Sequence, residues 1–322
     1  IVTIIFFACG PTPVEVVVTA TVPAQSLSTP SDQTDQQSSP SADQTTLTRE
    51  QKSYLAHATV RILGVKNIGG QMQPFYNGSG TLLSSDGIIL TNCHVADPVY
   101  FGFPPDQNPD ALVVELVNTE DKPPIPSFYA TVVAKDATLD LAVIKIHSTL
   151  DGSPINPSQL SLPTVQIGNS DATSFGDPLF VFGFPGIGGD TITYSTGSIS
   201  GFDSENPIGD RAWIKTDALI AGGNSGGLAT NANGEIIGVP SKLGTTSAQN
   251  LTDCRVIQDT NGDGIIDQYD SCIPTGGFIN GIRPINWAAA LITAANTGQT
   301  YVSPYDSQQA QIPNAPPQTG ST

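Results

Sequence analysis

From residue 59 onward the chain consists of short β-branched runs separated by glycine, proline, asparagine and aspartate. The runs recur at spacings of roughly eight to twelve residues, which is typical of a β-sandwich or β-barrel and leaves no room for long helices. The sequence therefore predicts an all-β fold. The expected strands cover residues 59–65, 80–84, 88–91, 112–117, 130–134, 141–146, 179–184, 191–200, 212–216 and 235–240.

Two short helices are expected at the edges of this β-rich region. Thr48 is a suitable cap for a helix over residues 49–58, because a threonine hydroxyl accepts hydrogen bonds from the first free backbone N–H groups of a helix. Apolar residues at helical spacing predict a closing helix over residues 285–297. The folded domain is therefore expected to span residues 49–300.

The composition excludes several classes of protein. The 322 residues include 29 acidic and 12 basic side chains, a formal net charge of −17, and only 13% of the residues are charged. A nucleic-acid partner is not expected, because binding a phosphate backbone requires stripes of Lys and Arg. A membrane-spanning helix is not expected either, because no stretch of the chain reaches the roughly 18 consecutive apolar residues that such a helix needs. With 32 glycines and 26 prolines, the chain has the composition of a secreted or surface β-protein.

The two ends of the chain are expected to lie outside the fold. The chain begins at Ile1 rather than methionine, so a fragment or processed form is expected. Residues 1–8 are apolar and precede Cys9, which resembles the end of a bacterial lipoprotein signal peptide. That resemblance implies lipidation of Cys9 and a cell-surface or periplasmic lipoprotein; an ordinary secretory signal is the alternative. Residues 9–48 and 301–322, rich in Ser, Thr, Gln and Pro, are expected to form a flexible tether and tail.

Three segments carry residue types suited to nucleophilic catalysis. They are TNCHV at residues 91–95, DLAV at 140–143 and GGNSGG at 222–227. A serine hydroxyl is a weak nucleophile at neutral pH and needs a neighbouring base. His94 would accept the proton of Ser225, and Asp140 would hold the imidazole in the required tautomer. The segments occur in the order His, Asp, Ser, which is the order of the chymotrypsin arrangement.

These motifs resemble those of the trypsin-like serine proteases, and most closely those of the HtrA/Deg group. The resemblance extends to GNSD at 168–171, GFPG at 183–186 and GEIIGV at 234–239. It implies two six-stranded antiparallel β-barrels with a short C-terminal helix. It also implies a serine endopeptidase that hydrolyses protein substrates through an acyl-enzyme, with His94, Asp140 and Ser225 as the catalytic triad.

The resemblance also implies an oxyanion hole at Gly223, Asn224 and Ser225, where glycines permit the tight turn that aims backbone N–H groups at the substrate. Asp136 is the alternative to Asp140. His57 and His147 lack a catalytic context and are expected to be structural or exposed. A buried structural role for His94 and a catalytically inactive homologue are two further alternatives.

A substrate pocket is expected on both sides of the serine loop. Leu219 lies six residues before Ser225, where relatives that cleave after Lys or Arg carry an acid, so small or medium aliphatic P1 residues are expected. The segment from Gly238 to Lys242 is expected to form the opposite wall, with Gly238, Val239 and Pro240 in the pocket. Many members of the group also carry a PDZ domain and form trimers. A Pro- and Gln-rich tail follows Ser303, so PDZ-based regulation is not expected, and a homotrimer stays one possibility.

The segment DTNGDGIIDQYD at residues 259–270 has the oxygen-ligand spacing of an EF-hand loop, with Gly264 at its sixth position. Helices are not expected on its flanks, and the segment resembles a thrombospondin type 3 or dockerin-like repeat. It predicts one structural Ca²⁺ site beside the substrate pocket; an acidic surface turn is the alternative. The expected ligands are Asp259, Asn261, Asp263, the carbonyl of Ile265, Asp267 and Asp270.

Cys254 and Cys272 bracket the calcium loop, and a disulfide between them would close a short loop in an oxidising compartment. Pairing of Cys93 with one of these late cysteines is the alternative.

The main alternative to a protease is a catalytically silent module that uses the barrels and the calcium loop for adhesion.

Overall fold

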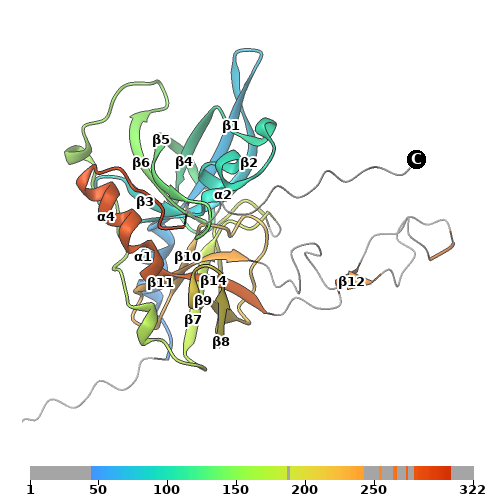
Figure 1. Ribbon diagram of the computed structural model, residues 1–322. Coiled ribbons are helices and arrows are strands. Elements are labelled where there is room, and N and C mark those ends of the chain that lie inside the picture. The colour runs from blue at the N-terminus through green and yellow to red at the C-terminus, as the bar shows by residue number, and fades with distance from the viewer. Residues whose placement is uncertain are drawn as a thin grey trace, which may run out of the picture. The chain divides into compact units, whose positions relative to one another are not determined.

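The computed structural model describes residues 45–186, 189–242, 254–255, 264–266, 273–274 and 279–305. Its main strands form two closed antiparallel barrels of six strands each, followed by a short C-terminal helix (Figure 1). The strand order is β1-β2-β3-β6-β5-β4 in the first barrel and β10-β11-β14-β9-β8-β7 in the second. The predicted fold class is therefore confirmed.

The first barrel consists of β1 (Thr59–Ile68), β2 (Gln71–Leu82), β3 (Ile88–Thr91), β4 (Ala111–Leu116), β5 (Ile125–Asp136) and β6 (Leu141–Thr149). The second consists of β7 (Pro178–Gly183), β8 (Thr193–Glu205), β9 (Gly209–Thr216), β10 (Leu228–Thr230), β11 (Ile236–Lys242) and β14 (Asn280–Pro284). A separate two-stranded sheet pairs β12 (Cys254–Arg255) with β13 (Ile273–Pro274). In the described ranges the α-helices are α1 (Arg49–His57), α2 (Cys93–Ala96), α3 (Pro98–Phe101) and α4 (Ala289–Thr297). The same ranges contain four 3-10 turns: η1 (Pro105–Gln107), η2 (Pro157–Gln159), η3 (Ser170–Ala172) and η4 (Ile285–Ala288).

The first two strands extend beyond the barrel as a two-stranded ribbon. Residues Gly69 and Gly70 join them with φ values of +63° and +86°, which a two-residue hairpin turn with left-handed backbone requires. The β-branched pattern predicts the second strand only from residue 80, because residues 71–79 contain no β-branched side chain. Pairing with β1 makes them a strand, so tertiary context overrides the local propensity.

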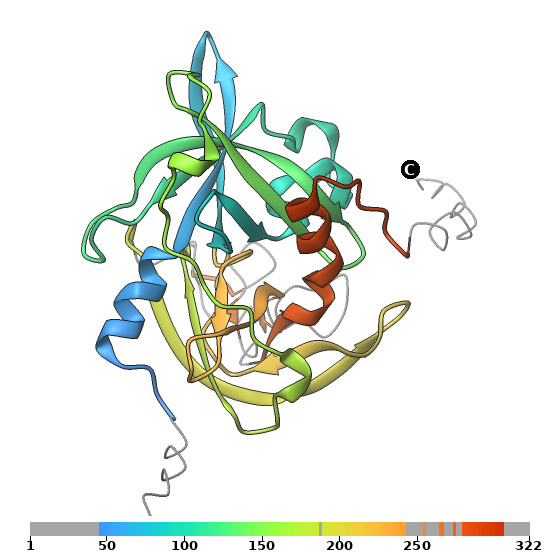
Figure 2. The ribbon, with the colours of Figure 1, turned by 90° about the vertical axis from the view of Figure 1, so that its left-hand side faces the viewer.

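Two helices flank the barrels, and Figures 1 and 2 show α1 and α4 on the same side of them. The start of α1 is fixed by a capping box, in which the Thr48 hydroxyl accepts from Gln51 N and the Gln51 side chain accepts from Thr48 N. Leu55 of α1 and Leu291 of α4 are buried in one apolar cluster with Leu141 and Phe180 from the two barrels. The helices therefore tie the two barrels together. The predicted closing helix is α4, although η4 forms its first turn.

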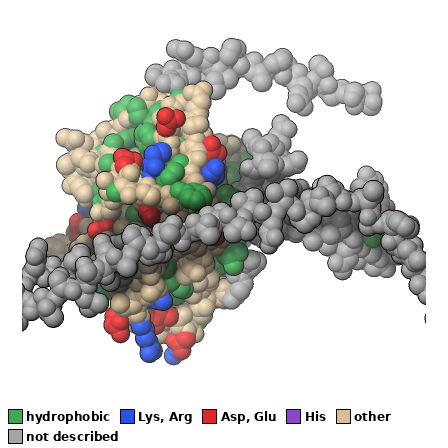
Figure 3. Space-filling view, turned by 90° about the horizontal axis from the view of Figure 1, so that it is seen from below, with side chains coloured by type: hydrophobic (Ala, Val, Ile, Leu, Met, Phe, Trp, Pro, Cys, Tyr) green, Lys and Arg blue, Asp and Glu red, His purple; other side chains and the backbone are tan. Residues whose placement is uncertain are grey.

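Each barrel also has an apolar interior of its own. Ile62, Leu82 and Ile144 belong to the interior of the first barrel, and Val181 and Ile214 to that of the second. On the face shown in Figure 3, acidic and basic side chains lie as neighbours on a largely uncharged surface. Within the described residues, no helix combines the length and apolar character needed to cross a bilayer.

Candidate active site

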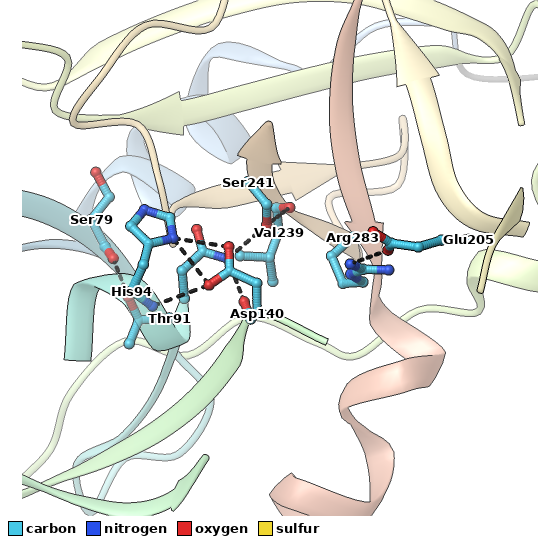
Figure 4. Close-up of polar contacts among 9 residues, drawn as sticks. Ser79, Thr91, His94, Asp140, Glu205, Val239, Ser241 and Arg283 are labelled. Atoms are coloured by element: carbon cyan, nitrogen blue, oxygen red, sulfur yellow. Dashed lines mark hydrogen bonds and ion pairs between the residues drawn. The ribbon is translucent and has the colours of Figure 1, made fainter. Parts of the chain in front are cut away.

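His94 and Asp140 are in direct contact at the junction of the two barrels (Figure 4). His94 lies in α2, directly after β3, and Asp140 lies in the turn between β5 and β6. The Nδ1 atom of His94 is 3.0 Å from Oδ1 and 2.9 Å from Oδ2 of Asp140, and the backbone N of His94 donates to Oδ1 at 3.1 Å. With Nδ1 turned to the carboxylate, Nε2 is the ring nitrogen left to exchange a proton with another group.

The turn that presents Asp140 is built from residues 136–140. Asp136 accepts a hydrogen bond from Leu139 N at 2.9 Å, and Asp140 adopts a φ of +53°, in the left-handed region. Such a backbone costs a non-glycine residue roughly 1–2 kcal/mol. The buried Asn92 stabilises it, because its Nδ2 donates to the carbonyl of Asp140 at 2.7 Å and to Ser241 Oγ at 2.6 Å. Asn92 thus joins the turn of the first barrel to β11 of the second.

Ser225 lies in the loop between β9 and β10, and its backbone is fixed from both barrels. Its carbonyl accepts from Ser79 N of β2 at 2.8 Å, and the next residue, Gly226, donates to Pro240 O of β11 at 3.0 Å. Gly226 has a φ of +84°, and a Cβ atom there would lie 2.1 Å from Thr91 Oγ1. Glycine is therefore required at position 226, both for the left-handed backbone and because a side chain would collide with Thr91.

His94 and Ser225 line one cleft of about 270 Å³. Gly222 and Gly223 contribute backbone to its wall, and Val95 and Phe103 contribute apolar surface. The cleft therefore brings together a carboxylate-bound imidazole, a partly exposed serine and a glycine-rich loop, the groups that nucleophilic acyl transfer requires.

The sequence of this region matches a family model, the trypsin-like peptidase domain, over residues 78–239, half of the chain. The chain belongs to this family. It is 34% identical over 175 residues to the periplasmic serine endoprotease DegP of Escherichia coli K12, and 33% identical over 162 residues to the serine endoprotease DegS of Salmonella typhimurium. The human serine protease HTRA4 is 32% identical over 176 residues. The alignments cover 50–54% of this chain but only 31–38% of these relatives.

Asp136, the alternative to Asp140, is engaged elsewhere in this peptidase domain. It is fully buried, and Oδ2 accepts from the hydroxyl of Tyr301 at 2.7 Å. Burial, reinforced by Asp136, raises the pKa of Tyr301. Of the other histidines, His57 contacts the carbonyl of Ser53 at 2.7 Å and His147 is exposed. Among the three histidines, His94 is therefore the one in contact with Asp140.

The residues expected to form the substrate pocket differ in exposure. Leu219 is 75% exposed, and its carbonyl accepts from Ser195 Oγ at 2.8 Å. Gly238, Val239 and Pro240 are buried within β11, where Gly238 pairs with Ala229 of β10. Asn224, expected at the oxyanion hole, donates its backbone N–H to Ala221 O at 3.0 Å.

Cys93 is adjacent to His94 in sequence and is buried, and it forms no disulfide with any residue that the structure describes. Burial, and then the negative charge of Asp140, raise the pKa of its thiol. The sulfur is therefore protonated at neutral pH and is not a nucleophilic thiolate.

Most of the predicted calcium loop lies outside the described residues, including Asp259, Asn261, Asp263, Asp267 and Asp270. Gly264 has a φ of +84°, and the side chain of Ile265 is more than half exposed. Cys9 and Cys272 also lie outside the described residues, and Cys254 is described only through its backbone pairing with Pro274. In the part of the chain that is described, no group of three or more His, Cys, Asp or Glu side chains forms a metal site.

Two residues that support this site have no predicted role. Asn92 lies in the TNCHV motif and Ser241 lies in the segment expected to form the pocket wall, but the sequence does not predict a contact between them. Their contact joins residues 149 positions apart, and no local pattern indicates it. The one local indication of a supporting role is that Asn92, with its amide side chain, directly precedes Cys93 and His94.

Proposed function

We propose that this chain is a serine endopeptidase of the HtrA/Deg type, with Ser225, His94 and Asp140 as its triad. The observation that carries the proposal is the contact of His94 with both oxygens of Asp140 at the wall of the cleft that Ser225 also lines. Family membership and the similarity to DegP and DegS support it. The expected substrates are proteins and peptides.

The proposed reaction follows from these positions. Ser225 Oγ attacks the carbonyl carbon of the scissile bond while its proton passes to Nε2 of His94. The imidazolium, stabilised by Asp140, then gives that proton to the leaving amine, and an acyl-enzyme remains on Ser225. Water attacks the acyl-enzyme in the same way and restores the serine. The backbone N–H groups of Gly223 and Ser225 are proposed to stabilise the oxyanion, because the N–H of Asn224 is engaged within its own turn.

We also propose that the chain prefers small or medium aliphatic P1 residues. The support is the apolar Leu219 at the position where an acid would favour Lys or Arg. A panel of fluorogenic peptides that differ only at P1 tests this proposal. Faster cleavage after Ala or Val supports it, and a clear preference for Arg overturns it.

A structural Ca²⁺ in residues 259–270 is a further proposal. The donor set fits the ion, because carboxylate and carbonyl oxygens are the ligands that Ca²⁺ prefers, and the left-handed Gly264 matches the glycine at the sixth loop position. When bound, the ion would neutralise clustered carboxylates. We also propose a disulfide between Cys254 and Cys272. A cell-envelope location with a lipid anchor at Cys9 is proposed as well, and the location is supported by the similarity to DegP, which is named as a periplasmic protease.

The proposed activity is tested by incubating the chain with casein and with quenched fluorescent peptides in the presence of Ca²⁺. The matched control is Ser225→Ala, which removes the nucleophile and leaves the loop glycines in place. Cleavage by the wild type that Ser225→Ala abolishes supports the endopeptidase. Equal signals from the two proteins overturn it and favour the catalytically silent adhesion module.

A further inference from the structure

Ser79 in β2 has a side chain that bridges the two barrels beneath the cleft. It is fully buried, its Oγ donates to the carbonyl of Gly223 at 2.7 Å, and it accepts from Phe184 N at 2.9 Å. Its backbone is fixed as well, since Ser79 N donates to Ser225 O and Ser79 O accepts from Thr91 Oγ1 at 2.7 Å (Figure 4). One hydroxyl therefore holds two segments of the second barrel from the first.

The peptide groups on both sides of Gly223 are anchored through their carbonyls. The carbonyl of Gly222 accepts from Gly186 N at 2.7 Å, and that of Gly223 accepts from Ser79 Oγ. A trans peptide is planar and its C=O and N–H point in opposite directions. Fixing the carbonyl of Gly222 therefore sets the direction of the Gly223 N–H, one of the two proposed oxyanion donors.

Residues 184–186, which anchor Gly222, are themselves held by hydrogen bonds to side chains of β2. Phe184 N donates to Ser79 Oγ, and Phe184 O accepts from Asn77 Nδ2 at 3.0 Å. Two residues later, Gly186 makes its bond to Gly222. Gly223 has a φ of +100°, and a Cβ atom there would lie 2.3 Å from Phe184 O. Phe184 and Gly223 are thus in close contact, and the backbone of each forms a hydrogen bond with the Ser79 hydroxyl.

We propose that Ser79 is a positioning residue for the oxyanion hole. Its hydroxyl fixes the Gly223 carbonyl directly, and it fixes the Gly222–Gly223 peptide through Phe184 and Gly186. This inference rests on the proposed endopeptidase function. Removal of the hydroxyl leaves Ser225, His94 and the substrate cleft unchanged in composition but frees the Gly223 N–H to turn.

Ser79→Ala tests the proposal. We expect kcat to fall by about 10- to 100-fold, below the loss caused by removing an oxyanion donor outright, while KM stays within about twofold. A peptide aldehyde, which forms a tetrahedral adduct with an oxyanion on the serine, should bind the variant more weakly by a similar factor. The matched control is Ser170→Ala, because Ser170 is equally buried and its hydroxyl accepts from Asn286 N at 3.2 Å. It lies outside the cleft and should keep wild-type kcat.

The outcomes separate this inference from the function on which it rests. A wild type that hydrolyses peptides, with Ser79→Ala equal to Ser170→Ala in kcat and in aldehyde affinity, overturns the inference alone. An inactive wild type overturns both. If Ser79→Ala does not fold, as judged by its melting curve, Asn77→Ala replaces it: this variant removes the donor to Phe184 O and also shortens a side chain that lines the cleft. It should lower kcat in the same direction by a smaller factor, and a rise in KM alone overturns the inference.

Discussion

Asn92→Ala is expected to damage both stability and catalysis, because the Asn92 amide holds Asp140 in a strained backbone. The side chain is fully buried and donates two hydrogen bonds, to Asp140 O and Ser241 Oγ. The bond to Ser241 contributes about 1 kcal/mol net, and the buried carbonyl of Asp140, left without its donor, costs about 1–3 kcal/mol. The Oδ1 atom of Asn92 accepts no hydrogen bond from the residues that the structure describes, so the truncation loses none of those contacts there. The expected loss in the free energy of unfolding is therefore about 2–4 kcal/mol.

The effect on catalysis follows from the φ of +53° at Asp140. Without the Asn92 donor, the turn gains roughly 1–2 kcal/mol by relaxing to negative φ, which displaces the carboxylate from His94. Loss of the triad carboxylate in a related arrangement lowers kcat about 10⁴-fold, which sets the upper limit. Since Asn92→Ala keeps the carboxylate, a loss on the order of 10²-fold is expected.

Urea unfolding and steady-state hydrolysis of one fluorogenic peptide measure the two effects. Asn231→Ala is the matched control, because Asn231 Nδ2 donates to Glu235 and its Oδ1 accepts from two backbone N–H groups in the β10–β11 turn, away from the cleft. It should lose stability and keep kcat. The reasoning is refuted if Asn92→Ala retains wild-type kcat while it is folded.

Two further predictions concern stability. Tyr301→Phe removes the donor to the buried Asp136 and should cost about 2 kcal/mol in urea unfolding. The pKa of Tyr301 is raised in the folded chain, so its contribution is complete below the unfolded value of about 10 and is lost as the pH rises above it; the variant should show a shallower alkaline loss of stability, and an unchanged slope contradicts this. Calcium at about ten times its Kd should add about 1.4 kcal/mol and raise the melting temperature by roughly 3–5 °C. Asp263→Ala should abolish that shift, and a wild type insensitive to chelator contradicts the calcium proposal.

The sequence allowed the fold to be predicted well, because its strand pattern and its three motifs act locally. The His94, Asp140 and Ser225 segments were identifiable because each sits in a short motif with its own glycines or apolar neighbours. The local pattern did not predict the strand over residues 71–79, because this strand forms only through pairing with β1.

The supports of the site were not predictable from local patterns. The Ser79 hydroxyl meets Gly223 across 144 positions, and Asn92 meets Ser241 across 149. These contacts form only when the two barrels pack together, and serine or asparagine in a strand carries no sign of its distant partner. The left-handed backbone of Asp140 is likewise a product of the turn and of Asn92, since aspartate alone prefers negative φ.

Covalent labelling of Ser225 by a fluorophosphonate tests the central claim most directly. The reagent reacts only with a serine that a neighbouring base activates, and mass spectrometry of the digested protein locates the adduct. The account predicts stoichiometric labelling at Ser225 in the wild type, and strong slowing in His94→Ala and Asp140→Asn. An unlabelled wild type, or labelling that is indifferent to both substitutions, would contradict it.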